Sequence, residues 1–134
     1  MTKRQVWRYK CDFCGKQNLS SVHMARHERH CTANPNRICR MCAHAENEQR
    51  PLPELIRALD TTIPGYGINE LRELASGCPM CMLAAVRQSG IGVWDGESHP
   101  PDLNWDFRAE LKKRWTELNN EAYEREQERV TYER

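Results

Sequence analysis

Cysteine and histidine are the residues of this sequence whose types and spacing could do chemistry. The first four candidates, in the spacing C-x2-C-x12-H-x3-C, are Cys11, Cys14, His27 and Cys31. A tight turn can aim two thiolates at one point, and a helix presents side chains four residues apart on one face. The spacing therefore predicts a tetrahedral metal site, and Zn2+ is the ion that thiolate and imidazole ligands commonly hold in this geometry.

A second set of cysteines consists of two pairs, each with two residues between its members. The pairs are Cys39 with Cys42 and Cys78 with Cys81. Two such pairs make one four-cysteine zinc site, and with the three cysteines of the first set they account for all seven. In a reducing compartment, regularly spaced cysteines are more often metal ligands than disulfides, so we expect two structural Zn2+ ions. The histidines that remain open as substitute ligands, because each lies near a predicted one, are His23, His30 and His44.

The first set of ligands lies in a segment with a family resemblance. The residues that carry it are Tyr9, Cys11, Cys14, Gly15, Lys16 and His27. Over residues 9–31 the chain resembles the standard C2H2 zinc finger, with Cys31 in place of the last histidine. The resemblance implies a ββα fold. Asn18 stands where that family usually has a core Phe, so we expect Leu19 or Met24 to supply the small core.

The finger helix has start and stop signals in the sequence. Ser20 or Ser21 can cap its amino terminus, and the dipeptide Asn34-Pro35 is expected to end it. If the helix starts at Ser21, the positions that read bases in such fingers are Ser20, His23 and Arg26. One finger reads only about 3 base pairs, so a second element or a second copy is expected to contribute.

The amino-terminal part of the chain is basic. Residues 1–40 carry nine Lys and Arg against two acidic residues, a net charge of +7, whereas the remainder carries −6. This asymmetry predicts that a polyanion binds at the amino-terminal end. The residues expected to contact phosphates are Lys10, Lys16, Arg29, Arg37 and Arg40.

Residues 35–92 are expected to form a four-cysteine helical module. Between the two cysteine pairs, apolar residues recur at helical spacing in two runs, which are Leu52, Leu55, Ile56 and Leu59, and Ile68, Leu71 and Leu74. We expect two short helices packed on the zinc site rather than a long loop. Cys78 and Cys81 open a further helix that stops at Gly90. A ligand pair at a helix amino terminus resembles treble-clef zinc modules, in which the positive helix end faces the thiolates.

Residues 93–134 are expected to form a loop and a long amphipathic helix. The apolar residues at spacings of three and four are Leu103, Phe107, Leu111, Trp115, Leu118 and Ala122. They predict a helix from about residue 103 to residue 130, capped by Asp102 or Asn104. The apolar stripe can pack on the zinc module, or it can bind a protein partner or a second copy of the chain. Periodicity does not distinguish these alternatives.

Composition favours a small, metal-stabilised, mainly α protein. With 134 residues, of which 39% are hydrophobic and 29% charged, the chain has little material for a large conventional core. The predicted division is a basic zinc finger at 1–34, the module at 35–92 and the loop and helix at 93–134. The amino terminus has no apolar run of signal-peptide length, and the longest apolar stretch is too short to span a bilayer. We therefore expect a cytoplasmic protein without a membrane partner.

The predicted sites favour a binding protein over an enzyme. Protein ligands fill all four positions of a structural zinc, whereas a catalytic zinc keeps one position open. We expect no catalytic residues, and a zinc protein that binds nucleic acid, DNA rather than RNA, in a regulatory role. One alternative is a protein-interaction adaptor that uses the four-cysteine module and the carboxy-terminal helix. A ββα-metal nuclease is less favoured, because only His44, Asn47 and Asn69 are available for its chemistry between residues 43 and 77.

Residues 11–42 carry one further resemblance, through the stretch HERHCTANPNRICRMC. This joint is similar to one in small zinc-binding proteins of tailed bacteriophages. The resemblance implies an accessory viral protein that acts in the host cytoplasm.

Overall fold

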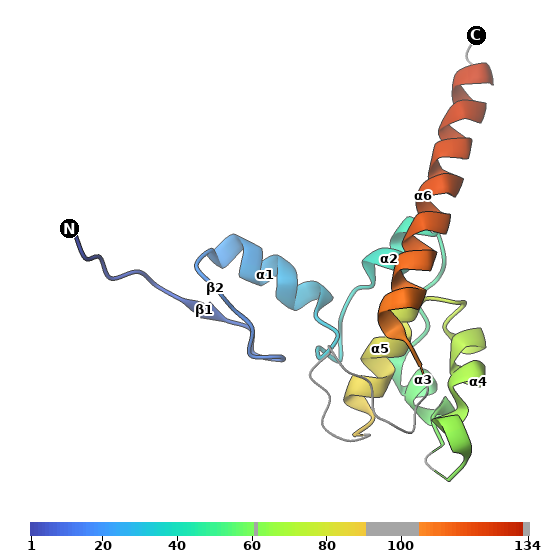
Figure 1. The fold of residues 1–134 in the computed structure, drawn as a ribbon, viewed down its shortest axis with the longest axis horizontal. Coiled ribbons are helices and arrows are strands. Elements are labelled where there is room, and N and C mark those ends of the chain that lie inside the picture. The colour runs from blue at the N-terminus through green and yellow to red at the C-terminus, as the bar shows by residue number, and fades with distance from the viewer. Residues whose placement is uncertain (61, 91–104, 133–134) are drawn as a thin grey trace.

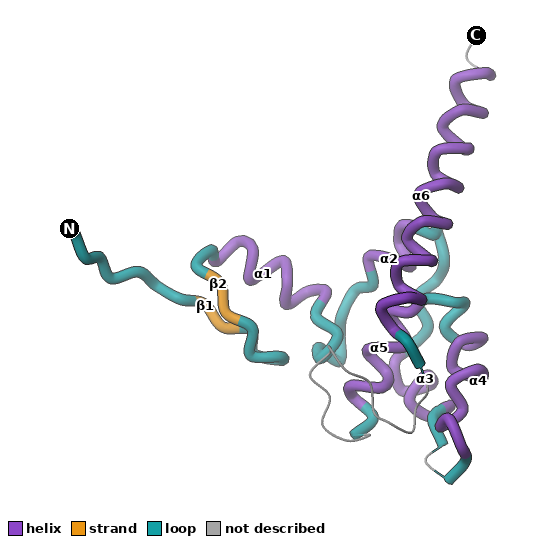
Figure 2. The backbone as a smooth tube through the Cα atoms, viewed as in Figure 1, coloured by secondary structure: helices purple, strands orange, loops and turns teal. Residues whose placement is uncertain are grey.

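The structure is a computed structural model of residues 1–134, and it describes all of them except residues 61, 91–104 and 133–134. The elements of the described residues, in chain order, are β1 (Tyr9–Lys10), β2 (Gln17–Asn18), α1 (Ser21–His30), α2 (Arg40–His44), α3 (Leu52–Ala58), the 3-10 helix η1 (Pro64–Gly67), α4 (Ile68–Leu74), α5 (Pro79–Gln88) and α6 (Phe107–Tyr132). Figure 2 shows that helices predominate and that the sheet is small. The prediction of a small, mainly helical protein with a long carboxy-terminal helix is confirmed.

The amino-terminal segment is a two-stranded hairpin followed by a helix. Strand β1 pairs with β2 in antiparallel register, with Tyr9 opposite Asn18. Helix α1 begins at Ser21, and the Ser20 hydroxyl accepts a hydrogen bond from the His23 backbone N–H at 3.3 Å, so Ser20 is the cap. Of the two predicted core residues, Met24 is buried and Leu19 is exposed. The interior of this segment is therefore small.

Helix α1 ends earlier than the Asn34-Pro35 signal predicts. Its last residue is His30, and Cys31 is the carboxy-terminal cap with ψ of 129°. Two carbonyls near the end of α1 find partners beyond the helix: the Asn34 side chain donates to Glu28 O at 2.8 Å, and the Ile38 N–H donates to Arg29 O at 2.9 Å. Because the following segment satisfies these carbonyls, the helix can stop before the proline.

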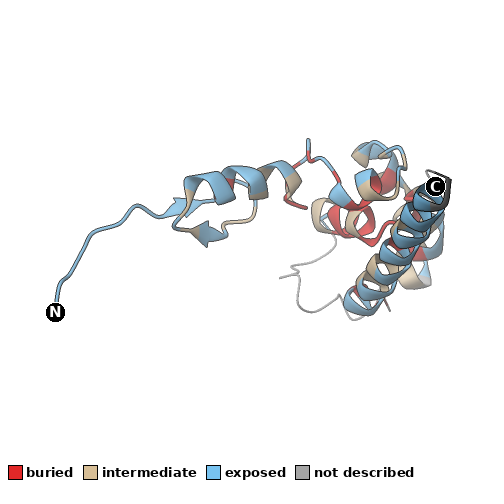
Figure 3. Ribbon diagram, turned by 90° about the horizontal axis from the view of Figure 1, so that it is seen from above, coloured by how far each residue is buried: buried red, intermediate tan, exposed pale blue. Residues whose placement is uncertain are grey.

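A helical body formed by α3, α4, α5 and α6 holds the main core. Helix α5 lies at its centre, and every residue from Pro79 to Val86 except Met80 is buried. Leu55 of α3 and Leu71 of α4 contribute fully buried side chains to the same cluster. Figure 3 shows the buried residues concentrated in this body, while the hairpin and α1 are mostly exposed. The two short helices predicted between the cysteine pairs are present and pack on α5.

The apolar stripe of α6 packs on the helical body. Leu118 and Phe107 are buried in the core cluster, and Leu111 and Trp115 pack against it. Leu103, which was predicted to start the stripe, lies outside the described residues, as do the predicted caps Asp102 and Asn104. The helix begins at Phe107, and the carboxylate that caps it belongs to Asp106, whose Oδ1 accepts from the Ala109 N–H at 3.1 Å.

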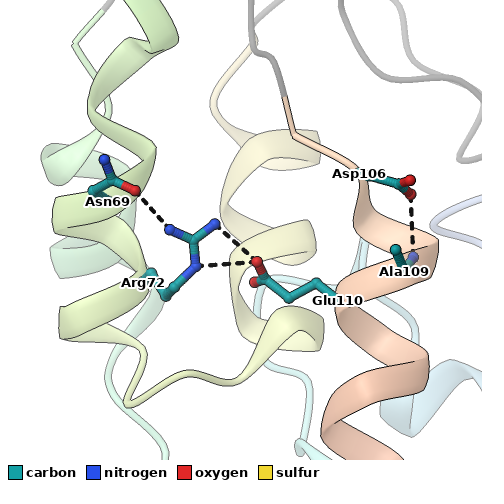
Figure 4. Close-up of polar contacts among 5 residues, drawn as sticks. All are labelled: Asn69, Arg72, Asp106, Ala109 and Glu110. Carbon is teal, nitrogen blue, oxygen red and sulfur yellow. Dashed lines mark hydrogen bonds and ion pairs between the residues drawn. The ribbon is translucent and has the colours of Figure 1, made fainter.

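An ion pair joins α6 to α4. Arg72 Nη2 and Nε both donate to Glu110 Oε1, at 2.8 and 3.1 Å, and Arg72 Nη1 donates to Asn69 Oδ1 at 2.7 Å (Figure 4). The pair is half-exposed, so screening by water limits its contribution to stability. It joins the first turn of α6 to α4.

The second half of α6 extends away from the rest of the chain (Figure 1). From Asn119 to Val130 all described side chains except Ala122 are exposed. Arg125 reaches back to Glu46 at 3.1 Å, an exposed contact. This part of the helix is therefore held mainly by its own backbone hydrogen bonds and local ion pairs.

The segment between α1 and α2 is bonded to α5. Gln88 Nε2 donates to Thr32 O at 2.7 Å and to Asn34 O at 3.1 Å, and Arg87 Nη1 donates to Thr32 Oγ1 at 2.7 Å. Thr32 and Asn34 are buried although both are polar. The hairpin segment is thus fastened to the body, and the predicted boundaries at residues 34 and 92 stay predictions. Among the described residues, no helix combines the length and the apolar character needed to cross a membrane.

Candidate metal centres

The structure brings the eight predicted ligands together in two clusters. The first consists of Cys11, Cys14, His27 and Cys31, and the second of Cys39, Cys42, Cys78 and Cys81. Within each cluster, one possible ligand atom from every residue lies within 4.8 Å of the others. None of the seven cysteines, all of which are described, forms a disulfide. Two metal sites therefore fit the cysteines, and a disulfide framework does not.

The first cluster is built by a tight turn and by the end of a helix. The Cys11 N–H donates to Lys16 O at 2.8 Å and the Gly15 N–H donates to Cys11 O at 3.0 Å, which folds the chain back between the two strands. Gly15 has φ of +79°, a left-handed conformation that glycine adopts without strain. Cys14 Sγ lies 3.2 Å from His27 Nε2, which assigns Nε2 as the ligand atom. The fourth ligand comes from the cap residue Cys31 rather than from within the helix.

Electrostatics at the first cluster prepares the imidazole for binding metal. Burial lowers the pKa of His27, and the positive charge of Lys16 lowers it further. A neutral imidazole is the form that binds metal, so this shift favours the ligand state. Burial raises the pKa of the Cys31 thiol to about 11, so that thiol needs the charge of a bound cation to ionise at neutral pH.

The second cluster is fully buried and joins two helix amino termini. Cys39 is the cap of α2, and its Sγ accepts from the Cys42 N–H at 3.4 Å. Cys78 occupies the same position before α5. The Sγ atoms of Cys39 and Cys78 are 3.5 Å apart, as are those of Cys42 and Cys81. Each pair therefore has its first cysteine at a cap and its second inside the first turn.

Hydrogen bonds among the four thiols make Cys39 the preferred anion of the second cluster. The thiols of Cys42, Cys78 and Cys81 act as donors to it and lower its pKa. Donation to Cys39 raises the pKa values of Cys42 and Cys78. One thiolate is thus stabilised by the others, and complete ionisation requires a cation at the centre.

Arg37 is a buried cation beside the second cluster. Its Nη1 donates to Cys81 Sγ at 3.6 Å, and the residue is only 6% exposed. Burial alone would lower its pKa, but the negative charges of Cys39 and Cys81 outweigh this effect and raise it. Arg37 was predicted to contact phosphate; its position assigns it to the four-cysteine centre instead, and we leave it out of the proposed nucleic-acid interface.

Gln49 holds the loop that carries Arg37 and Cys39. Its Oε1 accepts from the Cys39 N–H at 2.6 Å, and its Nε2 donates to Arg37 O at 2.9 Å. One amide therefore satisfies two backbone groups of the same loop. Neither Arg37 nor Gln49 was expected to support the cluster, because no local pattern in the sequence links either residue to ligands as distant as Cys81.

Both clusters fit a tetrahedral metal ion. Zinc–sulfur bonds of about 2.3 Å give a tetrahedron with edges of roughly 3.8 Å. The sulfur–sulfur distances of 3.5 Å in the second cluster are close to that edge. Thiolate and imidazole donors of this kind are the ligands of structural zinc sites. In both sites the metal would supply cross-linking of distant segments and stabilisation of thiolates.

The three histidines considered as substitute ligands lie outside both clusters. His30 Nδ1 donates to Ile38 O at 2.7 Å and so helps to fix the segment after α1. The ring of His44 packs against Trp115 with centroids 5.6 Å apart. His23 is exposed on α1. Their positions leave the predicted ligand sets unchanged.

The basic residues predicted to meet nucleic acid have different environments. Lys10, Lys16, Arg26, Arg29 and Arg40 are exposed. Every ion pair between described residues lies within residues 46–129, so the cations of residues 1–40 have no acidic partner there. The positive charge of the amino-terminal part is therefore not neutralised by the described part of the chain.

Comparisons with known proteins find no family model, no curated protein and no solved structure that matches this chain. The fold and the two clusters define a small, mainly helical protein with two candidate metal sites.

Proposed function

We propose that this chain is a non-enzymatic zinc protein that binds nucleic acid through its basic amino-terminal segment. Residues 9–31 form a ββα zinc finger in this proposal, and the four-cysteine cluster forms a treble-clef-like module. The observation that carries the proposal is a set of exposed cations that form no ion pair with another described residue, on a segment whose shape two metal sites can fix. They are Lys10, Lys16, Arg26, Arg29 and Arg40. Polyanions bind such surfaces through release of their counterions.

The proposed contacts come from the hairpin, from α1 with its cap, and from the first residue of α2. Ser20, His23 and Arg26 belong to α1 and its cap, and they are the candidates for contacts with bases. Lys10, Lys16, Arg29 and Arg40 supply cations for phosphates. DNA is the preferred nucleic acid, and a regulatory or accessory role in a phage is the biological setting we favour. A cytoplasmic location would keep the thiols reduced.

A non-enzymatic role is supported by the way in which each cluster is composed. Four side chains surround each candidate metal position, which leaves the ion no coordination site for water or substrate if all four bind. Two of the three residues available for a ββα-metal nuclease have other contacts: His44 packs against Trp115, and Asn69 accepts from Arg72.

The alternative is a protein-interaction adaptor, and one observation favours it. The second half of α6 extends away from the body and exposes Tyr123. A partner protein or a second copy of the chain could bind there. In that case binding would not depend on the basic residues of the amino-terminal segment.

The proposal is tested by titrating the zinc-loaded protein against labelled nucleic acid of mixed sequence, with single and double strands supplied separately, over a range of salt concentrations. A steep fall of log K with log salt is expected, because several phosphates are neutralised. Arg26→Ala should weaken binding by about 1–3 kcal/mol, as expected for an arginine that contacts a base. The matched control is Arg57→Ala, since Arg57 is an exposed arginine of α3 in the helical body. No binding of either form at low salt refutes the proposal.

A further inference from the structure

A cleft separates α1 from the helical body. Its volume is about 510 Å³, and its walls come from α1, the segment after it, α2, α5 and α6. Figure 1 shows the carboxy-terminal end of α1 beside this body. Its apolar lining residues, which we call its floor, are Met80, Leu83, Phe107 and Leu111. The cleft is large enough for a nucleotide-sized group, since small-molecule sites commonly measure about 300–1,000 Å³.

The rim of the cleft is cationic. We use the word rim for the three arginines that line it, Arg26, Arg40 and Arg87. The lining also contains His23, His27, His30, Cys31 and Thr32, and no aspartate or glutamate is among the described residues that line it. The side chains of Arg26 and Arg40 make no hydrogen bond or ion pair with another described residue. Arg87 donates to the neutral Thr32 hydroxyl. The rim therefore presents guanidinium groups without carboxylate partners above an apolar floor.

The position of the cleft conflicts with duplex reading by α1. A finger that reads a duplex inserts its helix into the major groove, about 12 Å wide, which one helix of about 10–12 Å diameter fills. His23 and Arg26, the candidates for base contacts, share the cleft with side chains of α5 and α6. A duplex that took α1 into its major groove at these two residues would also meet the side chains of α5 and α6 that line the cleft.

A single strand meets no such obstacle. Its bases are free to leave the stack, and binding sites for single strands combine cationic grooves with apolar or aromatic surfaces on which bases lie. The planar guanidinium group of arginine binds two oxygens of a phosphate through paired hydrogen bonds. The cleft offers both components within one cavity.

We propose that this cleft binds single-stranded nucleic acid, with an unstacked base on the floor at Leu111 and Met80 and flanking phosphates on Arg26, Arg40 and Arg87. The inference rests on the proposed function and specifies the form of nucleic acid. It gives the helical body a part in binding, where the resemblance to zinc fingers would assign the contacts to α1 alone.

The test compares a labelled strand of about 12 nucleotides with the duplex of the same sequence, by fluorescence anisotropy at fixed low salt. The zinc-loaded full chain should bind the single strand at least about tenfold more tightly. Leu111→Glu places a negative charge on the floor and should weaken single-strand binding about tenfold. Val22→Glu is the matched control: it adds the same charge to an exposed position of α1 outside the cleft, and its effect should stay below about threefold.

Circular dichroism would show whether Leu111→Glu still folds. If it does not, a second pair of variants tests the same cleft. Arg40→Ala removes a cation of the rim and should weaken binding of the single strand severalfold, whereas Arg57→Ala should leave that binding unchanged. If neither nucleic acid binds, the proposed function itself fails. If duplex and single strand bind equally and both glutamate variants weaken them equally, nucleic-acid binding stands and the cleft is overturned as its site. Preferential binding of an acidic peptide in a Leu111-dependent manner would also overturn it.

Discussion

Arg37 Nη1 lies 3.6 Å from the Sγ of Cys81, a residue 44 positions later in the chain. Four thiolates around a divalent cation carry a net charge of −2, and a buried guanidinium offsets part of it. The amino-terminal end of α5 adds a further positive potential, because Cys81 lies in its first turn. Part of the negative charge of the four-cysteine centre is therefore offset from within the protein interior.

Replacing Arg37 should weaken the centre. Arg37→Met removes the charge at similar length and should destabilise the folded protein by roughly 3 kcal/mol, because it leaves buried thiolate charge uncompensated. Thermal unfolding and zinc competition with a chelator measure the two effects. Arg57→Met is the exposed control and should change the free energy of unfolding by less than about 0.5 kcal/mol. An Arg37→Met variant that holds zinc as tightly as the parent would contradict the assigned role.

Metal removal should unfold the protein. The clusters join segments far apart in sequence, and the small interior of residues 9–31 offers little other support. Addition of a strong chelator should abolish most of the helical signal at 222 nm, and Zn2+ should restore it. Substitution with Co2+ should yield two equivalents of tetrahedral thiolate-bound ion in the visible spectrum. Retention of helix after complete chelation would sink the structural-metal hypothesis.

Acid should release metal from the first cluster only as the pH falls below 6.5, the ordinary pKa of a histidine. The folded pKa of His27 is lowered by burial below its ordinary value of 6.5. The neutral form is therefore favoured in the folded state, and this contribution to stability is present above pH 6.5 and is lost as the pH falls through the lowered pKa. Bound metal acts in the same direction. Zinc release followed with a fluorescent indicator from pH 8 to pH 5 checks this.

A second variant separates His27 from its neighbours in that titration. His23→Asn removes an exposed imidazole from the same helix and should release zinc over the same pH range as the parent. His27→Cys should still bind metal but with a different pH profile, since it replaces the imidazole with a thiolate. A shift of the profile in His23→Asn would mean that the wrong histidine had been assigned.

Leu118 should be the main hydrophobic anchor of α6. It is fully buried, so Leu118→Ala should cost about 2–5 kcal/mol of unfolding free energy. Tyr123→Ala, one helical turn further and exposed, should cost less than about 0.5 kcal/mol. Chemical denaturation of zinc-loaded protein measures both. Equal effects of the two substitutions would show that the apolar stripe of α6 does not serve the core.

The ion pair between Arg72 and Glu110 should contribute modestly. A double-mutant cycle with Arg72→Met and Glu110→Gln should give a coupling of about 0.5–1 kcal/mol, because the two side chains are half-exposed. The same cycle on Arg129 and Glu126, a more exposed pair within α6, should give a value near zero. Added salt should reduce the coupling energy of the Arg72–Glu110 pair. Comparing the two cycles shows how an ion pair between two helices differs in coupling energy from an ion pair within one helix.

Ligand spacing was the most informative part of the sequence. The two clusters contain the eight residues that spacing predicted, because a pair of cysteines two residues apart encodes its own local geometry. Leucine periodicity likewise predicted α3 and α4. Contacts between distant residues have no such local signal: the burial of Arg37 depends on Cys81, and the early end of α1 depends on bonds from Asn34 and Ile38.

The nucleic-acid contacts could be predicted only as a list of exposed cations. The sequence predicts Arg26 and Arg40 only as separate candidates for nucleic-acid contacts. They line one cleft because α1 lies against α5 and α6. That arrangement depends on hydrogen bonds from Arg87 and Gln88. Neither the spacing of apolar residues nor the distribution of charge along the sequence predicts these bonds. Helix caps were predictable where a serine precedes the helix, as at Ser20, and less so where several carboxylates and amides lie close together, as before α6.

The hydrogen bonds from Gln88 to Thr32 and Asn34 should couple the metal occupancy of the two centres. Cys78 and Cys81 lie at the start of α5, and Gln88 is its last residue. Loss of an ion from the four-cysteine centre would therefore loosen the helix that is bonded to the segment after the first cluster. Half-loaded molecules should consequently be scarce, and the protein should pass between its loaded and empty forms over a narrow range of free zinc. The occupancy of both sites should therefore rise steeply once the concentration of free zinc passes a threshold.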